Sequence, residues 1–164
     1  MSDLAPVSRT GGGFFLSRPL ESAMSARLFA LLLVLLPLAA HADITAGNGW
    51  VWRTRAGQSG SSAGLTLHSE QPATLLAVYA PGVGRIELHH SGVDSNGRRT
   101  MRRLPSLPLP AGKTLVLRED GIHLMLLGLA HPLSRGKLPL VLTLQDAGGG
   151  RHTLVTLLDV RVPQ

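Results

Sequence analysis

From residue 43 onward the chain alternates between apolar and polar positions in short runs, and no run keeps a helical period over three turns. Alternation with a period of two is typical of strands that bury one face. Turn-forming residues separate the runs, and we interpret Asp94–Gly97 and Glu119–Gly121 as hairpin turns. The pattern predicts strands over residues 49–54, 63–68, 74–80, 84–90, 98–104, 114–118, 122–127, 138–145 and 152–162.

Short strands at such close spacing predict an all-β fold, a two-sheet Greek-key β-sandwich. The segment between residues 104 and 112 contains Pro105, Pro108 and Pro110. Proline has no amide hydrogen for a central strand, so this segment is expected to be an extended connection. Residues 43–164 show no internal repeat and have a length that suits one domain with one core.

Residues 1–42 have a different character. Arg27–Ala42 combines one positive charge, an apolar run and the ending Ala40-His41-Ala42, which is the form of a secretory signal peptide cleaved before Asp43. The run is short for a transmembrane helix, and a short membrane anchor is the alternative. Residues 1–23 do not resemble the start of a signal peptide, so we expect Met24 to be the true start and residues 1–23 to be a dubious extension.

The composition excludes some kinds of metal site and bears on the choice of partner. The chain has no cysteine, which excludes a blue-copper site with a thiolate ligand and a cysteine-based zinc site. The net charge is +6, and much of the excess is the cluster Arg98, Arg99, Arg102 and Arg103. Basic clusters can bind nucleic acid, but export argues against that partner. We interpret the cluster as a solvated hairpin.

The methionines stand in a suggestive arrangement. After the predicted cleavage site the chain keeps only Met101 and Met125. Side chains at i and i+2 share one face of a strand, so His123 and Met125 are predicted to point together, opposite the apolar face that contains Leu124. His89 lies on the polar side of its strand, and Met101 alternates with arginines. Three strands are therefore expected to direct these donors away from the core.

Thioether and imidazole donors together favour a soft, low-valent metal, and Cu(I) accepts both. A lone His-x-Met triplet is weak evidence for a metal, and the combination carries the prediction. His68, His131 and His152 have no soft partner nearby in the sequence and are interpreted as surface residues. His90 has the apolar parity and fits a strand end better than a ligand.

The array His89-His90, ten residues, Met101, twenty-one residues, His123-Leu124-Met125 resembles the signature of the PCu(A)C periplasmic copper chaperones. The resemblance extends over nearly all of residues 44–162. It implies a cupredoxin-like β-sandwich in the periplasm, with His89, Met101, His123 and Met125 as Cu(I) ligands. His90 stands where the signature allows a methionine, and a second imidazole there could add a ligand or favour Cu(II).

The resemblance further implies delivery of copper to an acceptor protein, either the CuA subunit of cytochrome oxidase or a Sco-type protein, or general periplasmic copper handling. We expect a monomeric carrier and not an enzyme, because no nucleophile triad, phosphate loop or carboxylate pair stands out. Contact with a membrane is expected only through an uncleaved signal peptide or a membrane-bound acceptor. The alternative is an exported β-sandwich without a metal that binds a protein or a glycan.

Overall fold

The computed structural model describes residues 43–163, and the predicted signal peptide and N-terminal extension lie outside the described residues. In this part of the chain every regular element is a β-strand, and no helix is present that could span a membrane. The strands are β1 (Ile44–Trp52), β2 (Gly60–Ser69), β3 (Ala73–Tyr79), β4 (Val83–Val93), β5 (Arg99–Leu104), β6 (Leu107–Leu109), β7 (Lys113–Val116), β8 (Ile122–Leu129), β9 (Lys137–Asp146) and β10 (Arg151–Arg161).

All nine predicted strands are present, with ends that differ by a few residues. The tenth strand, β6, lies inside the proline-rich segment that the sequence predicted to be a connection. Among the described strands it pairs only with β3, at one end of the series. Pro108 is tolerated there because an edge strand leaves one side of its backbone unpaired.

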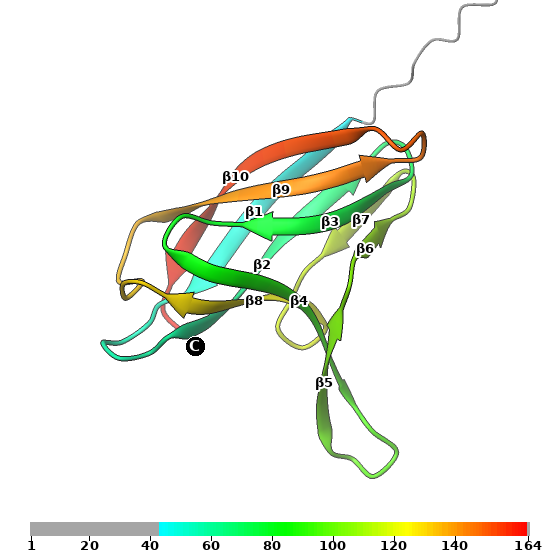
Figure 1. The fold of residues 1–164 in the computed structure, drawn as a ribbon. Coiled ribbons are helices and arrows are strands. Elements are labelled where there is room, and N and C mark those ends of the chain that lie inside the picture. Colours follow the sequence, from blue (N-terminus) through cyan, green and yellow to red (C-terminus); the bar gives the residue numbers. More distant parts are fainter. Residues whose placement is uncertain (1–42, 164) are drawn as a thin grey trace, which may run out of the picture. The chain divides into compact units, whose positions relative to one another are not determined.

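The strands form one hydrogen-bonded series in the order β5-β4-β8-β2-β1-β10-β9-β3-β6, with β7 paired to β2. Strand β1 joins the two halves, because it is antiparallel to β2 and parallel to β10. The series folds over, so that β9 and β3 lie in front of β1 and β2 (Figure 1). The predicted sandwich is thus all-β, with layers that are continuous through β1.

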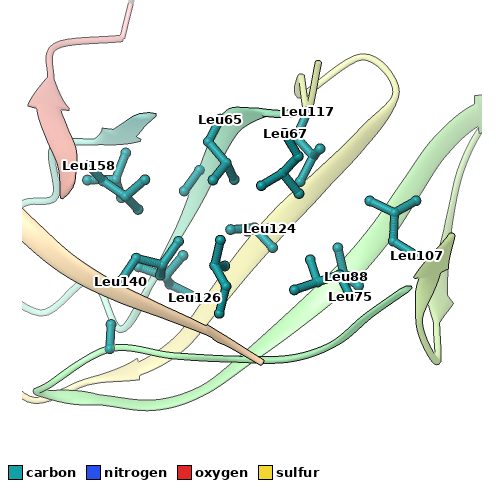
Figure 2. Packing of buried hydrophobic residues seen from close by; sticks show 14 of the residues in the cluster. Leu65, Leu67, Leu75, Leu88, Leu107, Leu117, Leu124, Leu126, Leu140 and Leu158 are labelled. Carbon is teal, nitrogen blue, oxygen red and sulfur yellow. The ribbon is translucent and has the colours of Figure 1, made fainter. Parts of the chain in front are cut away.

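Leucines from the facing layers fill the space between them (Figure 2). Leu65 and Leu67 of β2, Leu124 of β8 and Leu140 of β9 are at most 1% exposed. Complete burial of one such side chain stabilises the fold by about 1.5–3 kcal/mol. The apolar positions of the sequence pattern therefore face the core, and the polar positions lie on the outer faces of the strands. The candidate site uses the outer faces of β4, β5 and β8.

A glycine allows one close approach in this packing. Gly64 of β2 lies opposite Trp50, and a Cβ atom at this position would lie 2.2 Å from the carbonyl oxygen of Leu117 and 2.8 Å from Trp50 Nε1. We expect Gly64→Ala to lower the free energy of unfolding by about 2–3 kcal/mol, since backbone must move to relieve the clash.

Urea denaturation of the two proteins measures this loss. Gly92→Ala is the matched control, because a Cβ atom there would meet Thr100 Oγ1 at an ordinary 3.7 Å. Equal losses in the two variants would contradict the close contact at Gly64.

Candidate metal site

The candidate site lies on three neighbouring strands. In the β4–β8 pair His89 lies opposite His123, and in the β4–β5 pair Met101 lies opposite Ser91, two residues from His89. Residues directly opposite in an antiparallel pair share a face. All four predicted ligands therefore share one face of the β5-β4-β8 sheet, and the face also contains Glu87 and Arg103.

The two histidines form a close pair. Their ring centroids are 6.0 Å apart, with the rings inclined at 68°. His89 Nε2 lies 2.9 Å from Glu87 Oε2, and His123 Nδ1 lies 3.2 Å from the carbonyl oxygen of Gly121. The remaining ring nitrogens, His89 Nδ1 and His123 Nε2, are both buried and have no hydrogen-bond partner within residues 43–163.

These contacts define the tautomers. A carboxylate and a carbonyl only accept, so each must receive the ring N–H, and in the neutral ring the lone pair lies on the other nitrogen. Each unpartnered buried polar atom costs about 1–3 kcal/mol, and an imidazole lone pair of this kind is a donor that a metal ion can accept. No three His, Asp or Glu side chains within residues 43–163 form a metal site by themselves.

One prediction about exposure was wrong. His123 is on the predicted face, but it is fully buried and does not point into solvent. The turn before β8 folds back against β4, where Ser91 N donates to the Gly121 carbonyl at 2.9 Å, and Arg118 N donates to the Ile122 carbonyl at 2.7 Å. Strand alternation says nothing of such a turn, so it could not reveal this burial.

The methionines flank the histidine pair at different depths. Met125 is half-buried and lines a recess with Trp52, Ser62 and Glu119. Met101 is 56% exposed and lines a second recess, which Glu119 also borders. Trp52 Nε1 donates to Glu119 Oε2 at 2.9 Å and so holds this side chain between the two recesses. The structure brings the histidines together and leaves the methionines in separate recesses.

The other histidines of the described residues are not part of this pair. His90 is exposed on the opposite face of β4, where it pairs with Arg102, so it is not grouped with His89 and His123. His68 contacts Thr114 Oγ1 and Glu70 Oε1, and His152 lies 2.6 Å from Asp146 Oδ2. His131 is exposed.

Glu87 is a residue of the site that sequence reasoning missed. The alternation located it on the polar side with His89 but assigned it no role. Its hydrogen bond with His89, and then the guanidinium groups of Arg85 and Arg103, hold the pKa of this carboxyl below its usual value of 4.5. Glu87 therefore stays ionised at neutral pH. The Glu-x-His spacing on one strand face was the available signal.

Comparison with known proteins begins with the sequence. A family profile described as "Putative lipoprotein LpqE-like" matches residues 44–155. The "Putative lipoprotein Lxx21020" of Leifsonia xyli subsp. xyli is 28% identical over 95 residues, which are 57% of each chain. The chain thus spans just over half of the length of that curated relative.

Solved structures share the fold. The apo PCuAC domain from PmoF1 is 18% identical, with a TM-score of 0.56, over 75% of this chain and 100% of that domain. The Cu(I) form of DR1885 from Deinococcus radiodurans is 30% identical, with a TM-score of 0.53, over 78% of this chain and 85% of its own. The chain belongs to the LpqE-like family and has the PCu(A)C-type, cupredoxin-like β fold.

Proposed function

We propose that this protein is an exported Cu(I) carrier whose cargo is bound by His89, Met101, His123 and Met125. The observation that carries the proposal is the pair of buried, unpartnered imidazole nitrogens on adjacent rings. Met125 follows His123 on the same face, and Met101 lies on the same face of the neighbouring strand. The donor set is two imidazoles and two thioethers.

The chemistry of these donors favours Cu(I). Thioether sulfur is a poor ligand for Mg, Ca or Zn and a good one for Cu(I), and neutral imidazole accepts the same ion. Two structures with related folds are described as copper-bound, the PCuAC domain from PmoF2 and the Cu(I) form of DR1885. His90 is exposed on the opposite face of β4, so the proposed ligand set contains neither this residue nor a Cu(II) site formed by it.

The gradient of exposure across the donors suits a carrier more than a catalyst. His123 is fully buried, while Met101 is exposed at the edge of the site. An acceptor's donor groups would therefore meet Met101 first and could displace it while the histidines still hold the ion. We infer that the acceptor is a periplasmic copper protein, such as the CuA subunit of cytochrome oxidase or a Sco-type protein.

An anaerobic Cu(I) titration of the purified protein against a competing chelator tests the proposal, together with X-ray absorption at the copper edge. We expect one Cu(I) per chain, with both sulfur and nitrogen in the coordination shell. Failure to compete for Cu(I), or a shell of nitrogen and oxygen alone, would contradict the proposal. That outcome would favour the alternative, a β-sandwich without a metal that binds a protein or a glycan.

A substitution of Met101 tests whether this residue is a metal ligand or a packing residue. We expect Met101→Leu to weaken Cu(I) binding by about tenfold or more, because leucine has similar volume but no donor atom. The free energy of unfolding of the metal-free protein should change by less than about 0.5 kcal/mol, as is usual for an exposed position. Chelator competition and urea denaturation measure the two quantities. A large loss of stability without copper would instead make Met101 a structural residue.

A further inference from the structure

The carboxylate of Glu87 is held from both sides. Its side chain is 16% exposed on the site face of β4. Oxygen Oε2 lies 2.9 Å from His89 Nε2, while oxygen Oε1 lies 3.2 Å from Arg85 Nε and 3.8 Å from Arg103 Nε. Because both oxygens have partners, the carboxylate has little freedom to rotate away from His89.

This anchoring has a direct consequence for His89. When ionised, the Glu87 carboxylate accepts hydrogen bonds and has no proton to donate. The imidazole must therefore supply the N–H of this contact, at Nε2. The lone pair then lies at Nδ1, the nitrogen that is buried without a partner. A carboxylate behind a ligating histidine orients the ring and raises the basicity of the opposite nitrogen.

The two histidines are supported differently. His123 Nδ1 contacts the neutral carbonyl of Gly121, whereas His89 Nε2 contacts a charged carboxylate. Arg103, which lies opposite His89 and two residues from Met101, also approaches the Glu87 carboxylate. Through Arg103, Glu87 thus connects β4, the strand that bears His89, with β5, the strand that bears Met101.

We propose that Glu87 is a positioning residue that holds the His89 ring with Nε2–H toward its carboxylate and Nδ1 toward the metal. This inference rests on the proposed function, because the metal it prepares for is Cu(I). Glu87 itself is not a ligand in this arrangement, since both of its oxygens are already engaged.

The test uses Glu87→Leu and Glu87→Gln in the full chain, with Asp146→Asn as the matched control. Asp146 forms the same kind of carboxylate–imidazole contact with His152, at 2.6 Å, in another part of the fold. Loss of an outer-shell partner typically costs 10- to 100-fold in metal affinity. We expect a loss of about that size for Glu87→Leu, a smaller one for Glu87→Gln, which keeps an acceptor oxygen, and none for Asp146→Asn.

A copper-free measurement separates this inference from the proposed function. Nitrogen NMR of the imidazole groups in the metal-free protein should show a slowly exchanging Nε2–H on His89 that disappears in Glu87→Leu and persists in Glu87→Gln. A proton on Nδ1 of His89 in the unmodified protein would overturn the positioning role even if copper binds. Equal Cu(I) affinity in folded Glu87→Leu and the unmodified protein would also overturn it and leave the carrier intact, whereas no Cu(I) binding by the unmodified protein would overturn both.

Discussion

Replacing His123 with leucine is expected to lower Cu(I) affinity by more than 100-fold while leaving the metal-free domain at least as stable. The loss of affinity should exceed the 10- to 100-fold that follows removal of an outer-shell partner, because a direct donor is removed. His123 is fully buried, and its Nε2 has no hydrogen-bond partner in the part of the chain that the structure describes. A buried nitrogen without a hydrogen-bond partner lowers the stability of the metal-free protein.

The stability of the His123→Leu variant is the more informative half of this prediction. Leucine has a similar volume, removes the unpartnered nitrogen, and gives up only the 3.2 Å contact with the Gly121 carbonyl. We expect the free energy of unfolding to rise by about 1 kcal/mol, which is the order of the penalty for an unsatisfied buried polar group. A fall of several kcal/mol, measured by urea denaturation without copper, would make His123 a structural residue of the turn before β8.

His152→Leu is the control for the His123 experiment. His152 is a partly exposed histidine whose Nε2 contacts Asp146, and neither of its ring nitrogens is among the buried atoms without a partner in the described residues. Its replacement should leave Cu(I) affinity unchanged. A comparable loss of affinity in the two variants would contradict the assignment of the site to the β4–β8 face.

The second large effect is release of copper on acidification. Imidazole binds a metal only when neutral, so protons compete with the metal for each ring nitrogen, whereas a thioether does not take part in this competition. With two imidazole ligands, the affinity should fall with decreasing pH by a factor that approaches 100 per pH unit. We expect the affinity to fall steadily from pH 7 to pH 5, measured by chelator competition at each pH.

Glu87 does not account for such a loss. Its pKa lies below 4.5 because of the hydrogen bond with His89 and the nearby arginines, so it stays ionised across this range. The His123→Leu variant supplies an internal check, since one remaining imidazole should give about half the slope on a logarithmic scale. An affinity that is flat from pH 7 to pH 5 would contradict histidine ligation.

Much of the architecture was predictable from the sequence. The period-two alternation located nearly all the strands, because burial of every second side chain constrains the residue types along a strand. It also predicted that His123 and Met125 point together and that His89 and Met101 lie on the polar side of their strands. The register of β5, β4 and β8 then shows that all four lie on one face. Their role as ligands stays a prediction. Strand β6 was not predicted, because its pairing with β3 depends on a distant segment and not on its own residues.

By itself, then, the sequence determined the all-β class, the faces of the strands and the spacing of the donors, since these depend on residues close together along the chain. Only the tertiary structure decided how deeply each donor is buried, which nitrogen of each imidazole is left without a partner, and that Glu87 supports His89. Those properties arise where β4, β8 and the turn before β8 meet. Residues distant in the sequence set the burial and hydrogen bonding there, and a local pattern carries no record of such contacts.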